Sequence, residues 1–154
     1  MGGYAKLNPE RPRPQARSAF PHFLEIQTRW LDNDMYGHVN NSVYYSYFDT
    51  AINLYLIQSG ALTLAGEVLG LAVETGCNYF KEIAFPDRIF AGLRVGHVGR
   101  TSVRFEVALF RNDDEVAAAQ GHFVHVYVDR ETRQLMELSG EMKKSLAALV
   151  NQTN

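Results

Sequence analysis

The segment from Ser42 to Gln58 constrains the fold of this chain more than any other. Its polar residues recur at helical spacing and form one narrow stripe: Ser42, Ser46, Asp49, Thr50 and Asn53. The other positions are almost all apolar or aromatic, which predicts a helix buried on most of its sides. Asn40 or Asn41 can cap the start of this helix, and Gly60 stands where it should stop. The rest of the chain must therefore surround it.

The remaining segments have the patterns of strands that can do so. Polar and apolar residues alternate from residue 23 to residue 30, as in a half-buried strand. Residues 71–83, 87–99, 101–111 and 115–128 are predicted as four successive strands, with breaks at FPDR, VGRT and RNDDE. Short connections imply antiparallel neighbours. A short amphipathic helix is expected from Ser139 onward. These elements predict an α+β fold in which one curved antiparallel sheet wraps one long central helix.

A length of 154 residues is typical of a single domain. Residues 1–21 hold four of the five prolines and few apolar side chains. We therefore expect a flexible N-terminal leader over 1–21 and a single domain over 22–154.

The composition argues against several classes of protein. The formal net charge of −2 gives no electrostatic reason to expect nucleic acid or an anionic membrane as partner. The single cysteine, Cys77, cannot form an intrachain disulfide, which favours a reducing, cytoplasmic location. The sequence contains no apolar run near 18 residues and no signal-peptide pattern.

A dense polar cluster, DNDMYGHVNN at residues 32–41, directly precedes the predicted helix. One interpretation is a turn that also caps the helix, because Asp and Asn bond back to the backbone and Gly37 tolerates a positive φ. A calcium loop does not fit, because its twelfth position, which needs a bidentate Glu, is Val43. His122 and His125 point to opposite faces of a predicted strand and cannot chelate one ion. No metal site is expected.

The cluster and the helix behind it resemble a family signature. The pattern D-x-D-x-x-G-H-V-N-N-x-x-Y-x-x-Y-F, from Asp32 to Phe48, is similar to that of hotdog-fold thioesterases, and most similar to the 4-hydroxybenzoyl-CoA thioesterase type. The predicted order of strand, helix and four strands is also that of the family. The resemblance implies a hotdog fold, hydrolysis of an acyl-CoA with no cofactor besides the substrate's CoA, and a homodimer or homotetramer joined through the sheet.

The resemblance also implies roles for residues of the cluster. The catalytic carboxylate of the family maps onto Asp34, whereas Asp32 is expected to stabilise the turn. Some relatives carry a histidine seven positions after the catalytic aspartate; here that position is Asn41, which cannot titrate, and the histidine of the cluster is His38. We predict Asp34, Asn41 and His38 as catalytic residues, and Gly37 among the residues that bind the substrate.

Three further positions allow more than one role. Tyr44 is either an acyl-pocket residue or part of the core, and it is predicted as substrate-binding. Asp49 is a rival carboxylate, because a subset of the family takes its carboxylate from the helix; otherwise its carboxylate is hydrogen-bonded by Ser46 or Asn53. Arg100 resembles the family's basic position near the nucleotide and is predicted to bind CoA, with Lys81, Arg94 and Arg104 as alternatives.

The expected chemistry is acyl transfer to water. Free backbone N–H groups at the start of the helix would stabilise the oxyanion, and Asp34 would act as nucleophile or general base. The alternative is a non-catalytic module that binds acyl-CoA or acyl-carrier thioesters at the same place.

Overall fold

The computed structural model describes residues 12–150. It contains five strands, two α-helices and two short 3-10 helices. In chain order they are η1 Arg17–Ala19, β1 His22–Gln27, η2 Trp30–Asp32, α1 Asn41–Gln58, β2 Val68–Tyr79, β3 Arg88–Val98, β4 Ser102–Arg111, β5 Ala119–Asp129 and α2 Gly140–Ala147. The ends of β2 to β5 differ from the predicted ends by at most four residues.

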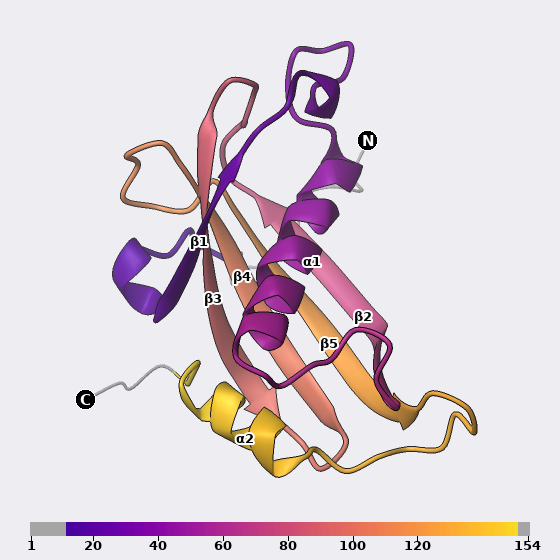
Figure 1. Cartoon of the computed structure of the whole chain (residues 1–154). Coiled ribbons are helices and arrows are strands. Elements are labelled where there is room, and N and C mark those ends of the chain that lie inside the picture. Colours follow the sequence, from indigo (N-terminus) through magenta and orange to yellow (C-terminus); the bar gives the residue numbers. More distant parts are fainter. Residues whose placement is uncertain (1–11, 151–154) are drawn as a thin grey trace, which may run out of the picture.

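The strands form one antiparallel sheet in the order β1-β3-β4-β5-β2, and α1 lies across its concave face (Figure 1). The predicted α+β hotdog architecture is therefore confirmed. The strands do not all pair in chain order. β2 does not pair with β3, which follows it; it pairs with β5 and forms the edge of the sheet opposite β1.

Helix α1 begins at Asn41, one residue before the predicted start, and ends at Gln58 as predicted. The side chain of Asn40 caps it by accepting a hydrogen bond from the amide of Ser42. At the other end, the chain turns out of the helix after Ser59, and Gly60 has a φ of 80°. Glycine adopts this conformation without the steric cost that a side chain would bring.

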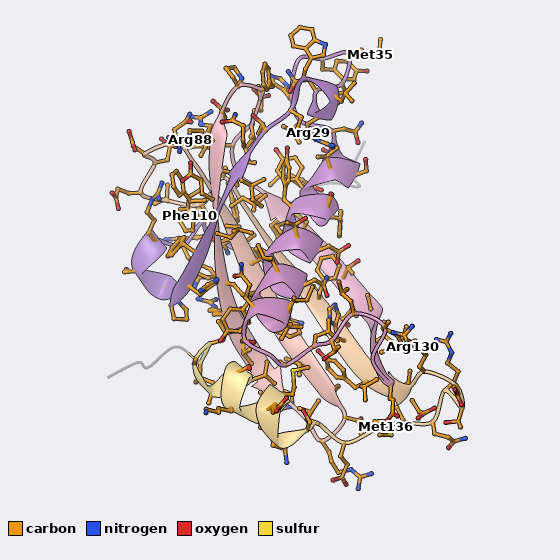
Figure 2. All side chains as sticks on the ribbon, viewed as in Figure 1. Arg29, Met35, Arg88, Phe110, Arg130 and Met136 are labelled. Carbon is orange, nitrogen blue, oxygen red and sulfur yellow. The ribbon has the colours of Figure 1, made fainter. Side chains whose placement is uncertain are left out.

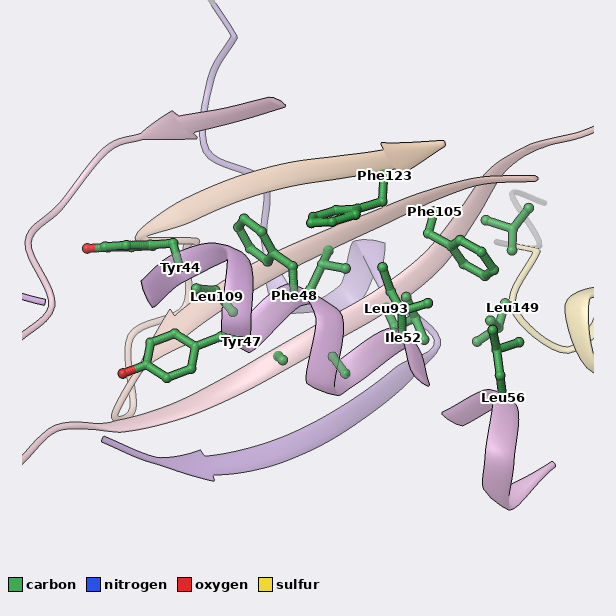
Figure 3. Close-up of a cluster of buried hydrophobic side chains, with 14 of the residues drawn as sticks. Tyr44, Tyr47, Phe48, Ile52, Leu56, Leu93, Phe105, Leu109, Phe123 and Leu149 are labelled. Atoms are coloured by element: carbon green, nitrogen blue, oxygen red, sulfur yellow. The ribbon is translucent and has the colours of Figure 1, made fainter. Parts of the chain in front are cut away.

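The core lies between α1 and the sheet (Figure 3). Phe48, Ile52 and Leu56 project from α1 and are at most 1% exposed. They meet apolar side chains of β3, β4 and β5: Leu93, Phe105, Leu109 and Phe123. Each such side chain stabilises the fold by about 1.5–3 kcal/mol when it is fully buried. The core therefore fixes both the position and the rotation of α1.

The expectation that α1 is buried on most sides is wrong for the single chain. The sheet covers one side of the helix only. Ser46, Asp49 and Thr50 are exposed on the other side, Val43 and Leu54 are half-buried, and Ile57 is 37% exposed. The apolar surface of α1 is therefore wider than the sheet of one chain can cover.

The flexible leader expected over residues 1–21 is also wrong in part. Residues 1–11 lie outside the described residues, but the following segment packs on the convex face of the sheet. Phe20 is 5% exposed and packs with Ala108, Phe110 and Ala117. The guanidinium of Arg17 donates to the carbonyl oxygens of Asp114 and Asn112. This cover explains why Ala108 and Phe110 of β4 are buried on the face opposite to α1.

None of the helices within residues 12–150 is sufficiently long and apolar to cross a lipid bilayer.

Candidate active site

The connection between β1 and α1 is a closed turn held by backbone hydrogen bonds. The amide of Asp34 donates to the carbonyl of His38 at 2.9 Å, and the amide of Gly37 donates to the carbonyl of Asp34 at 3.1 Å. Gly37 has a φ of 80°, which a residue with a side chain rarely adopts. A later residue, Val39, donates to the carbonyl of Ile83 at 2.7 Å. The turn is thus fixed to the segment that follows β2.

Asp32 anchors this turn, as predicted. Its carboxylate is fully buried and accepts hydrogen bonds from the Tyr47 hydroxyl at 2.6 Å and from the Arg29 amide at 2.8 Å. The Arg29 guanidinium lies 2.9 Å from the same carboxylate. Burial raises the pKa of Asp32, but the hydrogen bonds from Tyr47 and Arg29 outweigh it and hold that pKa below its ordinary value. The carboxylate therefore stays charged and ties η2 to α1.

Asp34 lies in an open environment two residues later. Its Oδ1 accepts the amide of Tyr36 at 2.8 Å, which fixes the side chain within the turn. Among residues 12–150, no group donates a hydrogen bond to its Oδ2. Asp34 also lines a cavity of about 450 Å³. One carboxylate oxygen is therefore positioned by the protein, and the other is available to a ligand.

The cavity gathers four of the six residues that the sequence predicted for the site, Asp34, His38, Asn41 and Tyr44. It is lined by Asp34, Tyr36, His38, Val39, Asn41, Tyr44, Tyr79, Phe80, Lys81 and Glu82. The His38 Nε2 lies 3.0 Å from a carboxylate oxygen of Glu82, so the histidine side chain has a partner across the cavity. Tyr44 is 3% exposed, and its ring meets the ring of Tyr79 edge-on at 4.9 Å between centroids. Figure 3 shows Tyr44 and Tyr47 at one end of the core, near the N-terminus of α1.

The start of α1 offers fewer free amides than expected. The amide of Ser42 donates to the Asn40 side chain, and the amide of Val43 donates to the Asn40 carbonyl at 2.9 Å. The expectation of several free N–H groups is therefore wrong for these two. Of the amides of Asn41, Ser42 and Val43, only that of Asn41 lacks a partner among the described residues. This single N–H, on a residue that lines the cavity, is the donor available to an oxyanion.

Comparison with known proteins places this chain in a family. Residues 28–146 match the family model described as the thioesterase-like superfamily. The chain belongs to this superfamily.

Solved structures agree with the superfamily assignment. The PA5185 protein from Pseudomonas aeruginosa strain PAO1 is 47% identical, with 92% of this chain and 100% of that chain covered and a TM-score of 0.89. A thioesterase from Thermus thermophilus, solved with coenzyme A and zinc, is 26% identical, covering 88% and 98% of the two chains with a TM-score of 0.69. A 1,4-dihydroxy-2-naphthoyl-CoA thioesterase from Synechocystis shares the fold at 16% identity, covering 81% and 94% with a TM-score of 0.74.

Arg100 and Gly37 do not join the other predicted residues of this thioesterase-like chain at the cavity. Arg100 lies in the turn between β3 and β4, near the opposite end of α1, where its guanidinium is 3.2 Å from Glu137. Gly37 instead lines an adjacent hollow with Asp34 and Met35. Its defined contribution is the positive φ of the turn. In contrast, Lys81, which the sequence offered as an alternative cation, lines the cavity.

Asp49, the rival carboxylate, lies on the exposed side of α1 and does not line the cavity. The expected hydrogen bond from Ser46 or Asn53 to its carboxylate is not formed: the Asn53 amide donates instead to the backbone carbonyl of Asp49 at 2.9 Å. Within residues 12–150, Asp34 and Glu82 are the carboxylates that line the cavity, and Glu82 is paired with His38.

Sequence reasoning missed most of the wall opposite Asp34. Tyr79, Phe80 and Glu82 lie at or just beyond the end of β2, and they reach the start of α1 because β2 pairs with β5 at the sheet edge. The sequence prediction gave residues 71–83 as a strand without naming the strand that pairs with it. The alternation of the strands carries no signal for the observed pairing.

No three His, Cys, Asp or Glu side chains among residues 12–150 are grouped so that they can hold a metal ion.

Proposed function

We propose that this chain is an acyl-CoA thioesterase of the 4-hydroxybenzoyl-CoA thioesterase type, with Asp34 as its catalytic carboxylate. The observation that carries the proposal is the meeting of Asp34, His38 and Asn41 around one cavity at the N-terminus of α1. Membership of the thioesterase-like superfamily supports the reaction class.

The proposed reaction gives Asn41 and Asp34 separate roles. The thioester carbonyl oxygen faces the free amide of Asn41, which stabilises the oxyanion together with the positive end of the α1 dipole. As general base, Asp34 takes a proton from water through Oδ2 while the water oxygen attacks the carbonyl carbon. As nucleophile, Oδ2 attacks that carbon itself, and water then cleaves the resulting anhydride. In both routes the carbon–sulfur bond breaks, and CoA leaves as the thiol.

Lys81 is the cation that this proposal assigns to the CoA phosphates. It lines the same cavity as Asp34, and its side chain is 45% exposed, 3.8 Å from Asp114. An ammonium at the edge of a cavity can hold a phosphate while the acyl end reaches the buried wall near Tyr44. The relative from Thermus thermophilus, whose structure contains coenzyme A, supports CoA as the carrier.

The test is thiol release from a panel of acyl-CoAs by the wild type and by Asp34→Asn. Asparagine keeps an oxygen that can accept the Tyr36 amide, so the turn persists while the charge is lost. We expect turnover to fall by about 10²–10⁴-fold. Asp49→Asn is the matched control, because it removes a carboxylate of α1 that does not meet the cavity, and we expect its turnover to be unchanged.

Two outcomes would overturn the proposal. If Asp49→Asn were inactive while Asp34→Asn kept its rate, the carboxylate of α1 would be the catalyst. If the wild type bound acyl-CoA and mass spectrometry recovered the ester intact, the chain would be a non-catalytic binding module.

A further inference from the structure

A second cavity lies at the opposite end of α1 from Asp34. It has a volume of about 230 Å³ and is enclosed by the α1–β2 connection, by β5, and by the segment that leads into α2. Its walls include apolar side chains that belong to the core or pack on it: Leu62, Val68, Leu138 and Met142. In Figure 2, Met136, which lines this cavity, lies at the other end of the molecule from Met35, which neighbours Asp34.

The cavity contains one buried polar group that the protein leaves without a partner. Tyr127 lines it from β5 and is 1% exposed. Its hydroxyl is the one buried side-chain oxygen or nitrogen in residues 12–150 that has no hydrogen-bond partner. A buried hydroxyl without a partner is destabilising, and phenylalanine would fill the same space without that cost. A molecule bound in the cavity that Tyr127 lines would supply the missing hydrogen-bond partner.

The hydroxyl keeps its proton and can therefore donate a hydrogen bond. Burial raises the pKa of Tyr127, so the phenol stays protonated. The ring of Tyr127 packs closely over Gly70 of β2, because a Cβ on Gly70 would lie only 3.0 Å from the ring carbon Cε1. This close contact restricts the position of the ring. The O–H of Tyr127 is therefore a held donor beside the apolar side chains Leu62, Val68 and Leu138.

The charges around the cavity select against anions. Glu67, Glu137 and Glu141 line it, and none of the Lys, Arg and His residues within 12–150 does so. Arg100 lies 3.2 Å from Glu137 and Arg130 donates to the carbonyl of Gly66, but neither lines the cavity. A carboxylate or phosphate would therefore meet like charges, whereas an uncharged molecule would not.

We propose that this cavity binds a small, uncharged and largely apolar molecule whose oxygen acceptor receives the hydrogen bond of Tyr127. In another protein, an engineered apolar cavity of about 150 Å³ binds benzene. The volume of the cavity described here therefore fits a one-ring molecule with a short polar substituent. The site lies at the other end of α1 from Asp34 and does not depend on the proposed hydrolysis.

The experiment is a ¹H–¹⁵N NMR titration with two neutral probes of matched shape. Acetophenone carries a carbonyl acceptor, and ethylbenzene does not. We expect acetophenone to shift the amides of Leu62, Gly66 and Leu138, and Tyr127→Phe to weaken its binding about five- to tenfold. Ethylbenzene should bind the wild type and Tyr127→Phe equally. Benzoate, an anion of the same size, should bind at least about tenfold more weakly than acetophenone.

Two control variants make the result specific. Tyr55→Phe removes a hydroxyl that donates to the Ser145 carbonyl at 2.7 Å and does not line the cavity, so it should change neither affinity. Asp34→Asn should bind acetophenone as the wild type does, which separates this site from the proposed active site. If Tyr127→Phe kept full affinity for acetophenone, or if the shifts occurred around Asp34, the proposal would be overturned.

Discussion

Asp32 and Asp34 stand two residues apart, yet they have opposite environments. The carboxylate of Asp32 is fully buried with Tyr47 and Arg29, whereas Asp34 keeps one oxygen open to a cavity. The first is suited to hold charge in place, and the second is suited to react. One turn thus separates a structural acid from the acid that we propose as the catalyst.

This contrast predicts that Asp32→Asn destabilises the fold. Asparagine would lack the negative charge of the carboxylate, which now accepts hydrogen bonds from the Tyr47 hydroxyl and the Arg29 side chain. Hydrogen bonds to charged groups contribute about 1.5–3 kcal/mol, so we expect the free energy of unfolding to fall by about 2–3 kcal/mol. Urea denaturation measures this change. Asp49→Asn, at an exposed carboxylate, should change stability by less than about 0.5 kcal/mol.

The lowered pKa of Asp32 predicts that the stabilising effect of its carboxylate depends on pH. The folded-state pKa of Asp32 is below its unfolded value of 3.8. Its contribution is therefore present above the unfolded pKa and is lost as the pH falls through the folded pKa. As the pH is lowered from neutral through 3.8 and below, the stability difference between the wild type and Asp32→Asn should shrink. A constant difference across this range would contradict the charged state assigned to Asp32.

At the scale of elements, the Asn40 cap connects the turn to α1. Its side-chain oxygen accepts both the amide and the hydroxyl of Ser42. We expect Asn40→Ala to lower the free energy of unfolding by about 1 kcal/mol, because the Ser42 amide loses its partner. Asn40→Asp should restore stability, because aspartate caps equally well and its charge suits the helix dipole. Thermal denaturation of the three proteins distinguishes these outcomes; an equal loss in both variants would argue against capping.

Local sequence signals were sufficient for α1 and insufficient for the sheet order. The cap, the apolar positions and Gly60 act within a few residues of one another, so they define the helix ends directly. The neighbour of β2 depends on contacts between residues far apart, such as Gly76 with His122, which alternation cannot specify. The same limit applies to the site. Asp34, His38 and Asn41 were found from one continuous stretch, but Tyr79 and Glu82 reach it only through the β2–β5 pairing.

At the scale of the whole molecule, β2 and α1 leave apolar surface uncovered. β2 is an edge strand of 12 residues, and Leu71 and Val73 on it are 39% and 62% exposed. Ile57 on α1 is also exposed. Proteins usually cover long apolar edges, because unpaired strands associate with other chains. This surface agrees with the homodimer or homotetramer predicted from the sequence, which stays a prediction.

The β2 edge makes that prediction specific. A second copy of the chain that pairs along β2 would continue the sheet across the two molecules and cover Leu71 and Val73. Light scattering coupled to size exclusion should then give at least twice the chain mass of 17.4 kDa for the wild type. Val73→Asp should release the single chain, because a carboxylate would be buried at the pairing edge. Leu135→Asp places the same charge at an equally exposed apolar position outside β2 and should leave the mass unchanged.

Since Tyr79 ends β2 and lines the Asp34 cavity, thiol release should fall in Val73→Asp and persist in Leu135→Asp. A wild type that runs as a single chain, or equal masses for the two variants, would show that β2 is not the interface.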